Sequence, residues 1–562
     1  MKENRINHLC ARFDELLKHA DSGSSAQVPT VLGADEVTGT VSMRGPTRRT
    51  VLTAAAGLAL LSFGGRTSLA VMSAPRARQT DLDFASASAA AKLIRQRKVS
   101  SEELTGRMLD RIARFNPQLN AVVNVLRDSA LAEARLADEA LARGKRVGPL
   151  HGVPILIKDA FEIANVPDTA GIQQLAKYRP TVDSEVVRRL RAAGAVILGN
   201  TNVPFLLNDW QSYNTIYGAT NNPWDVARTP GGSSGGSTAA LAAGLGYLSP
   251  GSDRSGSLRV PAHFCGVYAH KPSLNVVPLR GWFPSPPGAP PQLPETLAVA
   301  GPIARSAGDL MLAMQVLGGP DGPDAFAYRW SMPAPRRQRL QDYRVGFILD
   351  DAQCPLDAPV RKCLEEAVAA LRKAGVPLRE GWPRGVDPKA QYQEYLYQLY
   401  SVSGMPPGMK PEALEGLAAK ADASVGSIMA QANLDRHARY VDHARLQVDA
   451  RLAWQAAFAD IDVFLMPTSF VAAFPHDHSE PQVSRRLGTS AGPRPYLDLM
   501  FWTSFATLAG LPSTAAPVGR TADRLPVGMQ ILGPYLEDAT PIDFADRVAA
   551  VIGGFAPPPN FA

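Results

Sequence analysis

Two segments rich in glycine and serine have the residue types of a catalytic site. Residues 231–237 read Gly-Gly-Ser-Ser-Gly-Gly-Ser, which requires a tight backbone turn, and residues 251–259 read Gly-Ser-Asp-Arg-Ser-Gly-Ser-Leu-Arg. Ser257 in the second segment follows Ser233 in the first by 24 residues. A serine hydroxyl becomes a nucleophile when a nearby base takes its proton, so these serines are candidates for nucleophilic catalysis.

Residues 231–237 also allow two other interpretations. A glycine-rich turn before a helix can hold a phosphate, but the chain has no G-x-x-x-x-G-K-[ST] motif and no G-x-G-x-x-G with an acid about 20 residues later. Gly231 to Gly235 matches the G-x-S-x-G nucleophile elbow. That motif needs an apolar strand directly before it, and Ala227-Arg228-Thr229-Pro230 does not provide one.

Five separated motifs follow one another along the chain. They are Pro154 to Lys158, the glycine-serine turn, the serine 24 residues beyond it, Phe264-Cys265-Gly266 and Lys271-Pro272. Their order resembles that of the amidase signature family, with similarity from about residue 82 to about residue 550, including Pro526 to Gln530. The resemblance implies an α/β fold: a single large domain with a central mixed β-sheet that helices cover on both faces.

The resemblance also implies the roles of the site residues. Ser257 would be the nucleophile, Ser233 a bridging serine preceded by a cis peptide bond, and Lys158 the base. The developing oxyanion would be held by preorganised backbone N–H groups. Those donors would be Arg254, Ser255, Gly256 and Ser257, with Asp253 and Ser234 in support.

A lysine acts as a base only when its amine is neutral. The reference pKa of about 10.4 must therefore fall by roughly three units, at an expense of about 4 kcal/mol in ammonium stability. Burial of Lys158 at the end of a strand would lower the pKa. Asp159 would oppose this effect if it lay close to the amine, but neighbouring residues of a strand point to opposite faces.

One position departs from the family pattern Thr-Asp-x-Gly-Gly-Ser, which here is residues 252–257, Ser-Asp-Arg-Ser-Gly-Ser. Ser255 stands where a glycine is expected, and a serine there would be strained if the backbone needed a positive φ. The departure puts rate and substrate preference in question more than the type of reaction. Asp253 either orients this loop or is a simple turn aspartate.

The histidines offer a rival base. A Ser-His-Asp hydrolase would need one near Ser257, and His263 is the nearest in sequence; we interpret it as structural. His476-Asp477-His478 could ligate a metal, but it lies in a proline-bounded loop and lacks a third placed ligand, so a surface or cap-loop role is favoured. We expect neither a metal nor a cofactor.

We expect an amidase that hydrolyses a neutral, small or aryl-bearing carboxamide to an acid and an amine or ammonia. An apolar acyl pocket could be lined by Trp210, Tyr213, Trp282 and Phe283, which could equally be core residues. The first alternative is a hydrolase of esters or carbamates with the same triad. The others are the A-type subunit of a glutamine-dependent tRNA amidotransferase and a binding protein with a degenerate site.

The elements that must position these residues form one α/β body from about Asp81. Lys158 and Asp159 lie at the C-terminal end of a buried strand that begins at Val153. A helix capped by Ser184 then leads to a strand at 195–198, which completes a βαβ unit. Ser100 with Glu103 predicts a further helix start. Further central strands are expected at 345–349, 463–466 and 527–532. Residues 350–460 are helix-rich and could cap a site, and residues 284–294, with six prolines, form a surface loop.

The N-terminal part is interpreted as an extension, residues 1–78, before a catalytic domain at 79–562. Arg48 and Arg49 precede an apolar stretch at 51–63 that is too short to span a bilayer, which is typical of a twin-arginine export signal. We expect a periplasmic or secreted protein, with a cytoplasmic one as the alternative. Met43 is an alternative start to Met1.

The composition excludes collagen-like and disordered chains. The chain of 562 residues is 45% apolar and 20% charged, which is typical of a globular protein. The net charge of +6 comes without a basic run interleaved with aromatic residues, so we expect no nucleic-acid partner. No C-x-x-C pair occurs, and the sequence leaves open whether Cys354 pairs with Cys363 and whether the protein forms a homodimer.

Overall fold

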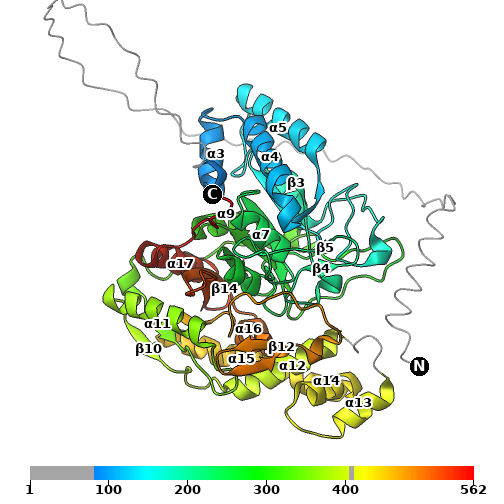
Figure 1. The fold of residues 1–562 in the computed structure, drawn as a ribbon, viewed down its shortest axis with the longest axis vertical. Helices are drawn as coiled ribbons and strands as arrows, with labels where there is room; N and C mark the ends of the chain where they lie inside the picture. The colour runs from blue at the N-terminus through cyan, green and yellow to red at the C-terminus, as the bar shows by residue number, and fades with distance from the viewer. Residues whose placement is uncertain (1–81, 404–409) are drawn as a thin grey trace, which may run out of the picture.

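The computed structural model describes residues 82–403 and 410–562, and the boundary at 78, the two start candidates and the twin-arginine segment lie outside these residues. An eight-stranded sheet forms the centre, with strand order β10-β9-β11-β15-β14-β7-β8-β6 (Figure 1). In the described part of the chain, no helix has the length and apolar character needed to cross a bilayer.

The central sheet is mixed. β9 pairs in parallel with β10 and β11, whereas the other neighbours are antiparallel. Its strands are β6 (Leu248–Asp253), β7 (Tyr268–Lys271), β8 (Val299–Ala304), β9 (Val345–Phe347), β10 (Leu378–Glu380), β11 (Val463–Pro467), β14 (Ser513–Arg520) and β15 (Pro526–Leu532). Every residue of β6, β8, β11 and β15 is buried, as expected of a sheet covered on both faces. The predicted α/β class with a central mixed sheet is confirmed.

The βαβ unit of the sequence is also present. β2 (Pro154–Lys158) and β3 (Val196–Thr201) are parallel and are joined through α6 (Glu185–Ala192). With β1 (Val122–Val125) they form a separate three-stranded sheet, so these two strands do not belong to the central one. A hydrogen bond of 3.1 Å from Tyr247 N to Pro154 O connects β2 to the chain just before β6.

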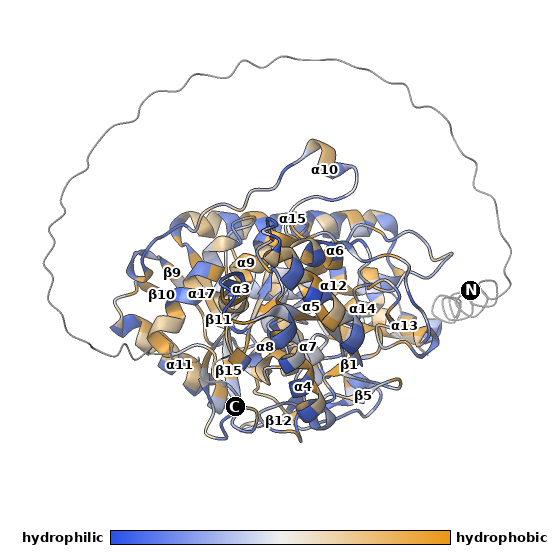
Figure 2. Cartoon of the chain, turned by 90° about the horizontal axis from the view of Figure 1, so that it is seen from above, coloured by the Kyte–Doolittle hydropathy of each residue, from blue (hydrophilic) through white to orange (hydrophobic). Residues whose placement is uncertain are grey.

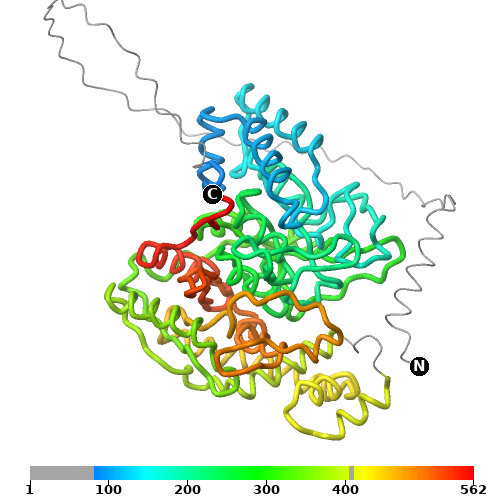
Figure 3. Tube along the Cα trace, in the orientation of Figure 1, coloured from blue at the N-terminus to red at the C-terminus, as the bar shows by residue number. Residues whose placement is uncertain are grey.

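The helices lie around both sheets. Ser100 accepts a hydrogen bond of 2.9 Å from Glu103 N, which confirms the predicted start of α4. The two ends of the described chain lie close together, because the Phe84 ring lies 6.2 Å from that of Phe555 (Figure 3). These helices are α3 (Ala87–Arg95), α4 (Ser101–Leu119), α5 (Arg127–Ala142), α7 (Gly235–Ala242), α8 (Arg259–Cys265), α9 (Ala307–Leu317), α10 (Asp324–Ala327), α16 (Met500–Leu508) and α17 (Ala539–Ile552).

The region at 350–460 is mostly helical, as predicted. It contains α11 (Ala358–Lys373), α12 (Pro388–Ser403), α13 (Pro411–Ala418), α14 (Val425–Leu434) and α15 (His437–Asp460). Two short hairpins complete the fold: β4 (Tyr213–Asn214) with β5 (Gly218–Ala219), and β12 (Arg486–Thr489) with β13 (Gly492–Pro495). The short α10 stands out from the body on an extended loop (Figure 2). Cys354 and Cys363 are free thiols, so the disulfide that the sequence left open does not form.

Candidate active site

A buried lysine and three serines form a polar cluster between β2, β6 and the start of α7. Lys158 is the last residue of β2 and its side chain is wholly buried. Its Nζ lies 2.7 Å from Ser233 Oγ, 2.9 Å from Ser234 Oγ and 2.9 Å from Ser252 Oγ. The structure thus brings together three residues that the sequence singled out, and adds Ser252, to which sequence reasoning gave no role. We call these four residues the Lys158 cluster.

The turn that carries Ser233 is closely packed. The peptide bond between Gly232 and Ser233 is cis, as expected. A Cβ atom on Gly232 would lie 2.9 Å from Gln211 N, so the segment around Gln211 leaves room for glycine alone. This packing holds the serines against the end of β2.

Ser257 lies between β6 and α8. A hydrogen bond of 3.1 Å from Ser234 N to Ser257 O holds it beside the Lys158 cluster. The residue is half-buried, and its hydroxyl makes no hydrogen bond within residues 82–403 and 410–562. The Ser257 side chain is therefore free to turn toward Ser233 or toward a bound molecule.

The charges of the site favour a neutral amine. Burial lowers the pKa of Lys158 to about 7, although the Asp253 carboxylate acts in the opposite direction. Burial alone would raise the pKa of Asp253, but its ion pair with Arg259, at 2.9 Å and with neither side chain exposed, lowers that pKa to about 2. Near pH 7, Asp253 is ionised while a large share of Lys158 is uncharged.

Asp253 orients the loop that follows β6. Its carboxylate accepts hydrogen bonds from Gly256 N at 2.8 Å and Leu258 N at 3.1 Å. Arg259, its partner, donates to Gln530 Oε1 at 3.0 Å, which links the loop to the motif at 526–530. This agrees with the loop-orienting interpretation of Asp253.

The backbone donors of this loop differ from the expectation at one position. The N–H groups of Arg254, Ser255 and Ser257 make no hydrogen bond in the part of the chain that the structure describes. The Gly256 N–H donates to Asp253 in this structure, and its role as an oxyanion donor stays a prediction. The positive φ of 88° falls at Gly256, and Ser255 does not share it, so the strain considered for Ser255 does not arise.

Two of the four aromatic residues border this loop. Trp210 donates from Nε1 to Ser255 O at 2.8 Å, and the Arg254 guanidinium carbon lies 5.7 Å from the centre of the Trp282 ring. Both tryptophans are 7% exposed, so they also form part of the core. Arg254 makes an ion pair of 2.8 Å with Glu295.

The other two aromatic residues have different environments. Tyr213 stacks on His478 with 3.8 Å between ring centres, and its hydroxyl accepts a hydrogen bond of 2.8 Å from Arg485. Phe283 packs between the main core and a small core around Tyr178, and its ring centre lies 6.3 Å from that of Trp282. A single acyl pocket lined by all four residues stays a prediction, because aromatic type alone does not distinguish a pocket wall from a core residue.

Asp159 and His263 do not contact the Lys158 cluster. Asp159 accepts a hydrogen bond of 3.0 Å from Thr169 N, and the carboxylate that raises the pKa of Lys158 is Asp253 and not Asp159. His263 lies 3.0 Å from Gly528 O and 3.1 Å from Val471 O through its two ring nitrogens, and burial lowers its pKa to about 4. The structural interpretation of His263 is confirmed.

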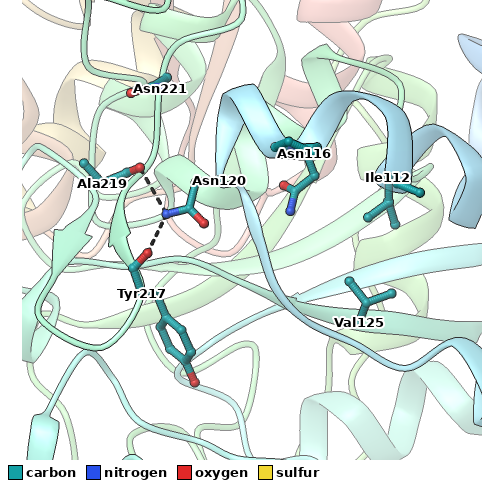
Figure 4. A pocket seen from close by; sticks show the side chains of 9 residues that line it. Ile112, Asn116, Asn120, Val125, Tyr217, Ala219 and Asn221 are labelled. Carbon is teal, nitrogen blue, oxygen red and sulfur yellow. Dashed lines mark hydrogen bonds between the residues drawn. The ribbon is translucent and has the colours of Figure 1, made fainter.

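Neither the histidine pair nor the surface pocket belongs to the Lys158 cluster. Among the described residues, no group of three His, Cys, Asp or Glu side chains is placed to hold a metal ion. A pocket of about 580 Å³ lies at the C-terminal end of α4, where Asn120 donates to Tyr217 O at 2.6 Å and to Ala219 O at 3.2 Å (Figure 4). It is lined by other residues than those of the Lys158 cluster, so we do not assign it to the reaction.

Comparison with known proteins gives the family. A family model described as Amidase matches residues 103–541. The A-type subunit of glutamyl-tRNA(Gln) amidotransferase from Synechococcus sp. (strain CC9605) is 34% identical over 490 residues, which cover 83% of this chain and 96% of that protein.

Solved structures show the same architecture. A 6-aminohexanoate cyclic dimer hydrolase is 26% identical with a TM-score of 0.66, covering 85% of this chain and 99% of that one. A bacterial aryl acylamidase of the amidase signature family shares the fold at 24% identity and a TM-score of 0.69, covering 83% of this chain and 96% of that one. The chain therefore belongs to the amidase signature family and is a hydrolase of amide carbon–nitrogen bonds.

Proposed function

We propose that the enzyme hydrolyses a neutral carboxamide through an acyl-enzyme on Ser257, with Lys158 as the base and Ser233 as the relay between them. One observation carries the proposal: a wholly buried lysine amine, with a pKa near 7, lies 2.7 Å from a serine hydroxyl. A general base is most effective when its pKa is close to the working pH.

The other two hydroxyls of the Lys158 cluster set the direction of the amine. A neutral amine has two N–H groups and one lone pair. Ser234 Oγ has an acceptor of its own in the Ser252 carbonyl oxygen at 3.4 Å, so it can accept from Nζ, and Ser252 Oγ can accept the second N–H. The lone pair is then left for the Ser233 hydroxyl at 2.7 Å.

Acylation begins when the Ser257 hydroxyl turns to Ser233, a rotation that takes picoseconds to nanoseconds for an accessible side chain. Ser257 Oγ forms a bond to the carbonyl carbon of the amide and passes its proton to Ser233 Oγ, while the Ser233 proton moves to Nζ. The negative oxygen of the tetrahedral intermediate takes hydrogen bonds from the free N–H groups of Arg254, Ser255 and Ser257.

Collapse of the intermediate breaks the C–N bond. The leaving nitrogen receives a proton from the Lys158 ammonium through Ser233, which returns the amine to its neutral form. A water molecule then attacks the ester on Ser257, again giving its proton toward Lys158. The acid departs, and Ser257 regains its proton by the same relay.

The local charges support a neutral substrate. The Arg254 guanidinium, three residues before Ser257, is matched by Glu295 at 2.8 Å. Its side chain thus carries no unmatched charge for a substrate carboxylate. Ester and carbamate hydrolysis would use the same steps, and parallel assays of a matched amide, ester and urethane would separate these activities.

Labelling with a fluorophosphonate tests the assignment. The reagent transfers a phosphonyl group to an activated serine, and peptide mass spectrometry identifies the residue. We expect the label on Ser257 in the wild-type enzyme and none in Ser257→Ala. A label on Ser233, or on no serine, would overturn the proposal.

A second candidate rests on the relative from Synechococcus, the A-type subunit of an amidotransferase, which is 34% identical. In that case the Ser257 acyl-enzyme would form from glutamine, and the released ammonia would serve another protein of the complex. Glutaminase activity that appears only when partner subunits are added would favour this function. Turnover of simple amides by the isolated chain would favour the first one.

A further inference from the structure

Residues 254–257, which we call the oxyanion loop, are held in two halves by different parts of the protein. Asp253 binds the N–H groups of Gly256 and Leu258, which fixes the second half. The first half receives no such support from Asp253. Its contacts come from side chains distant in the sequence, on the 209–211 segment and on α12.

Two aromatic side chains hold Ser255. Trp210 Nε1 donates to the Ser255 carbonyl at 2.8 Å, and the Tyr395 hydroxyl donates to Ser255 Oγ at 2.7 Å. The Tyr395 hydroxyl also lies 3.4 Å from the Arg254 carbonyl oxygen. Trp210 therefore holds the backbone of Ser255, and Tyr395 holds its side chain.

The Tyr395 side chain, which α12 contributes to this contact, is part of the buried core. Tyr395 has no exposed surface, and burial raises the pKa of its hydroxyl, so the group keeps its proton and remains a donor. A buried hydroxyl without a partner is costly, so the bond to Ser255 also satisfies Tyr395. Glycine, which the family pattern places at position 255, has no oxygen to accept this bond.

We infer that Tyr395 is a positioning residue for amide hydrolysis: through Ser255 it keeps the free N–H groups of the oxyanion loop aimed at the developing oxyanion. The inference rests on the proposed function and explains why a serine stands at this position. It also gives the helix-rich region at 350–460 a direct effect on the chemical step, because α12 supplies the hydroxyl.

Donor position matters because an oxyanion hole acts through preorganised geometry, and loss of one direct donor costs about 100-fold to 1000-fold in rate. Tyr395 does not touch the oxyanion itself. We therefore expect a smaller effect, about tenfold, on the chemical step alone. Binding of the ground state should change little, since the N–H groups form their strong contacts only as charge develops.

The test measures how fast a fluorophosphonate labels Ser257 in the full-length enzyme. The Ser257 oxygen displaces fluoride from phosphorus, its proton passes to Lys158, and the phosphoryl oxygen faces the loop donors. Saturation kinetics give the maximal labelling rate and the half-saturating concentration separately. For Tyr395→Phe we expect the first to fall about tenfold and the second to stay within about twofold.

Three further variants complete the design. Ser255→Gly should show the same loss, and Tyr395→Phe combined with Ser255→Gly should lose no more than either alone, because the two residues act as one unit. Tyr392→Phe is the matched control on α12: this ring packs against Phe501, its hydroxyl has no hydrogen bond in the described chain, and we expect wild-type rates.

Each contrary result would refute a different claim. If wild-type Ser257 is labelled and Tyr395→Phe reacts at the wild-type rate, the inference is wrong and the proposed function stands. Multiplying losses in the double variant would also overturn it, since Tyr395 would then act by another route. If the wild-type enzyme is not labelled at Ser257, the proposed function fails and this inference fails with it. Thermal melting followed by circular dichroism shows whether each variant is folded.

Discussion

Replacing Ser252 by alanine removes one of the three hydroxyls that contact Lys158 Nζ, the one at 2.9 Å from β6. The change leaves Ser233 and Ser234 in place and creates no charge. It therefore tests how the surroundings of the amine set its pKa without removing any group that passes a proton.

The wild-type enzyme supplies the baseline. With the Lys158 pKa at about 7, the rate per substrate encounter should rise tenfold per pH unit below pH 7 and become constant above about pH 8. The rate rises with pH because only the neutral Lys158 amine acts as a base. At pH 5, about one molecule in a hundred would hold the neutral amine.

The Ser252→Ala variant should shift this profile to lower pH. A hydroxyl acceptor stabilises the ammonium more than the amine, since hydrogen bonds to charged groups contribute about 1.5–3 kcal/mol and neutral ones about 0.5–1.5 kcal/mol. A difference of about 1 kcal/mol moves the acid limb down by roughly 0.7 pH unit. The plateau should fall severalfold, because the amine loses one of the contacts that set its direction.

The assay is kcat/KM for a chromogenic anilide or ester between pH 5 and pH 9. Ser249→Ala is the matched control, because Ser249 lies on the same buried strand but its hydroxyl contacts Ser237 at 3.0 Å and not Lys158. Its acid limb should coincide with that of the wild type. A wild-type rate that still rises tenfold per unit between pH 8 and pH 10, or an upward shift in Ser252→Ala, would refute the reasoning.

Three more predictions concern stability and processing. Burial raises the pKa of Asp168, beside Asp159, well above its usual value. The contribution of this carboxyl to stability should therefore fall as pH rises above about 4, and Asp168→Asn should gain up to about 1.4 kcal/mol per pH unit relative to the wild type in urea unfolding. A difference between the two proteins that stays constant from pH 5 to pH 8 would be the contrary result. In Gly256→Ala the residue would keep its φ of 88°, and the new Cβ atom would lie 2.7 Å from Thr503 Cγ2. The variant should therefore lose about 1–3 kcal/mol of unfolding free energy and turn over more slowly. A melting temperature equal to that of the wild type would contradict the packing argument. The native host should yield a protein whose N-terminus begins after the segment at 47–70, as mass spectrometry can show, and an intact Met1 in the cytoplasm would exclude export.

Local sequence signals predicted much of the site. The glycine-serine turn, the end of β2 at Lys158 and the cap at Ser100 each follow from neighbouring residues, because turns, caps and strand ends depend on short-range chemistry. The α/β class and the β2–α6–β3 unit could be inferred for the same reason. Strand pairing depends on distant partners, and this is why the sequence did not show that β2 and β3 form their own sheet.

Contacts between residues far apart in the sequence explain the features of the site that the sequence did not predict. Tyr395 lies 140 residues from Ser255, so no spacing rule connects them. Ser252 could have been found from its place one residue before Asp253 on a strand beside Lys158, but only once the strand neighbours are known. The position of the positive φ, at Gly256 and not at Ser255, depends on backbone geometry that residue type does not specify.

Acid quenching of the enzyme during turnover of an activated ester, followed by peptide mass spectrometry, tests the central claim most directly. The wild-type protein should carry the acyl group of the substrate on Ser257 within the first turnover. In Lys158→Met, which keeps the buried volume but has no amine, the same adduct should form about 100-fold to 10,000-fold more slowly. An acyl group on another residue, or acylation of Lys158→Met at the wild-type rate, would contradict the claim that a neutral Lys158 activates Ser257.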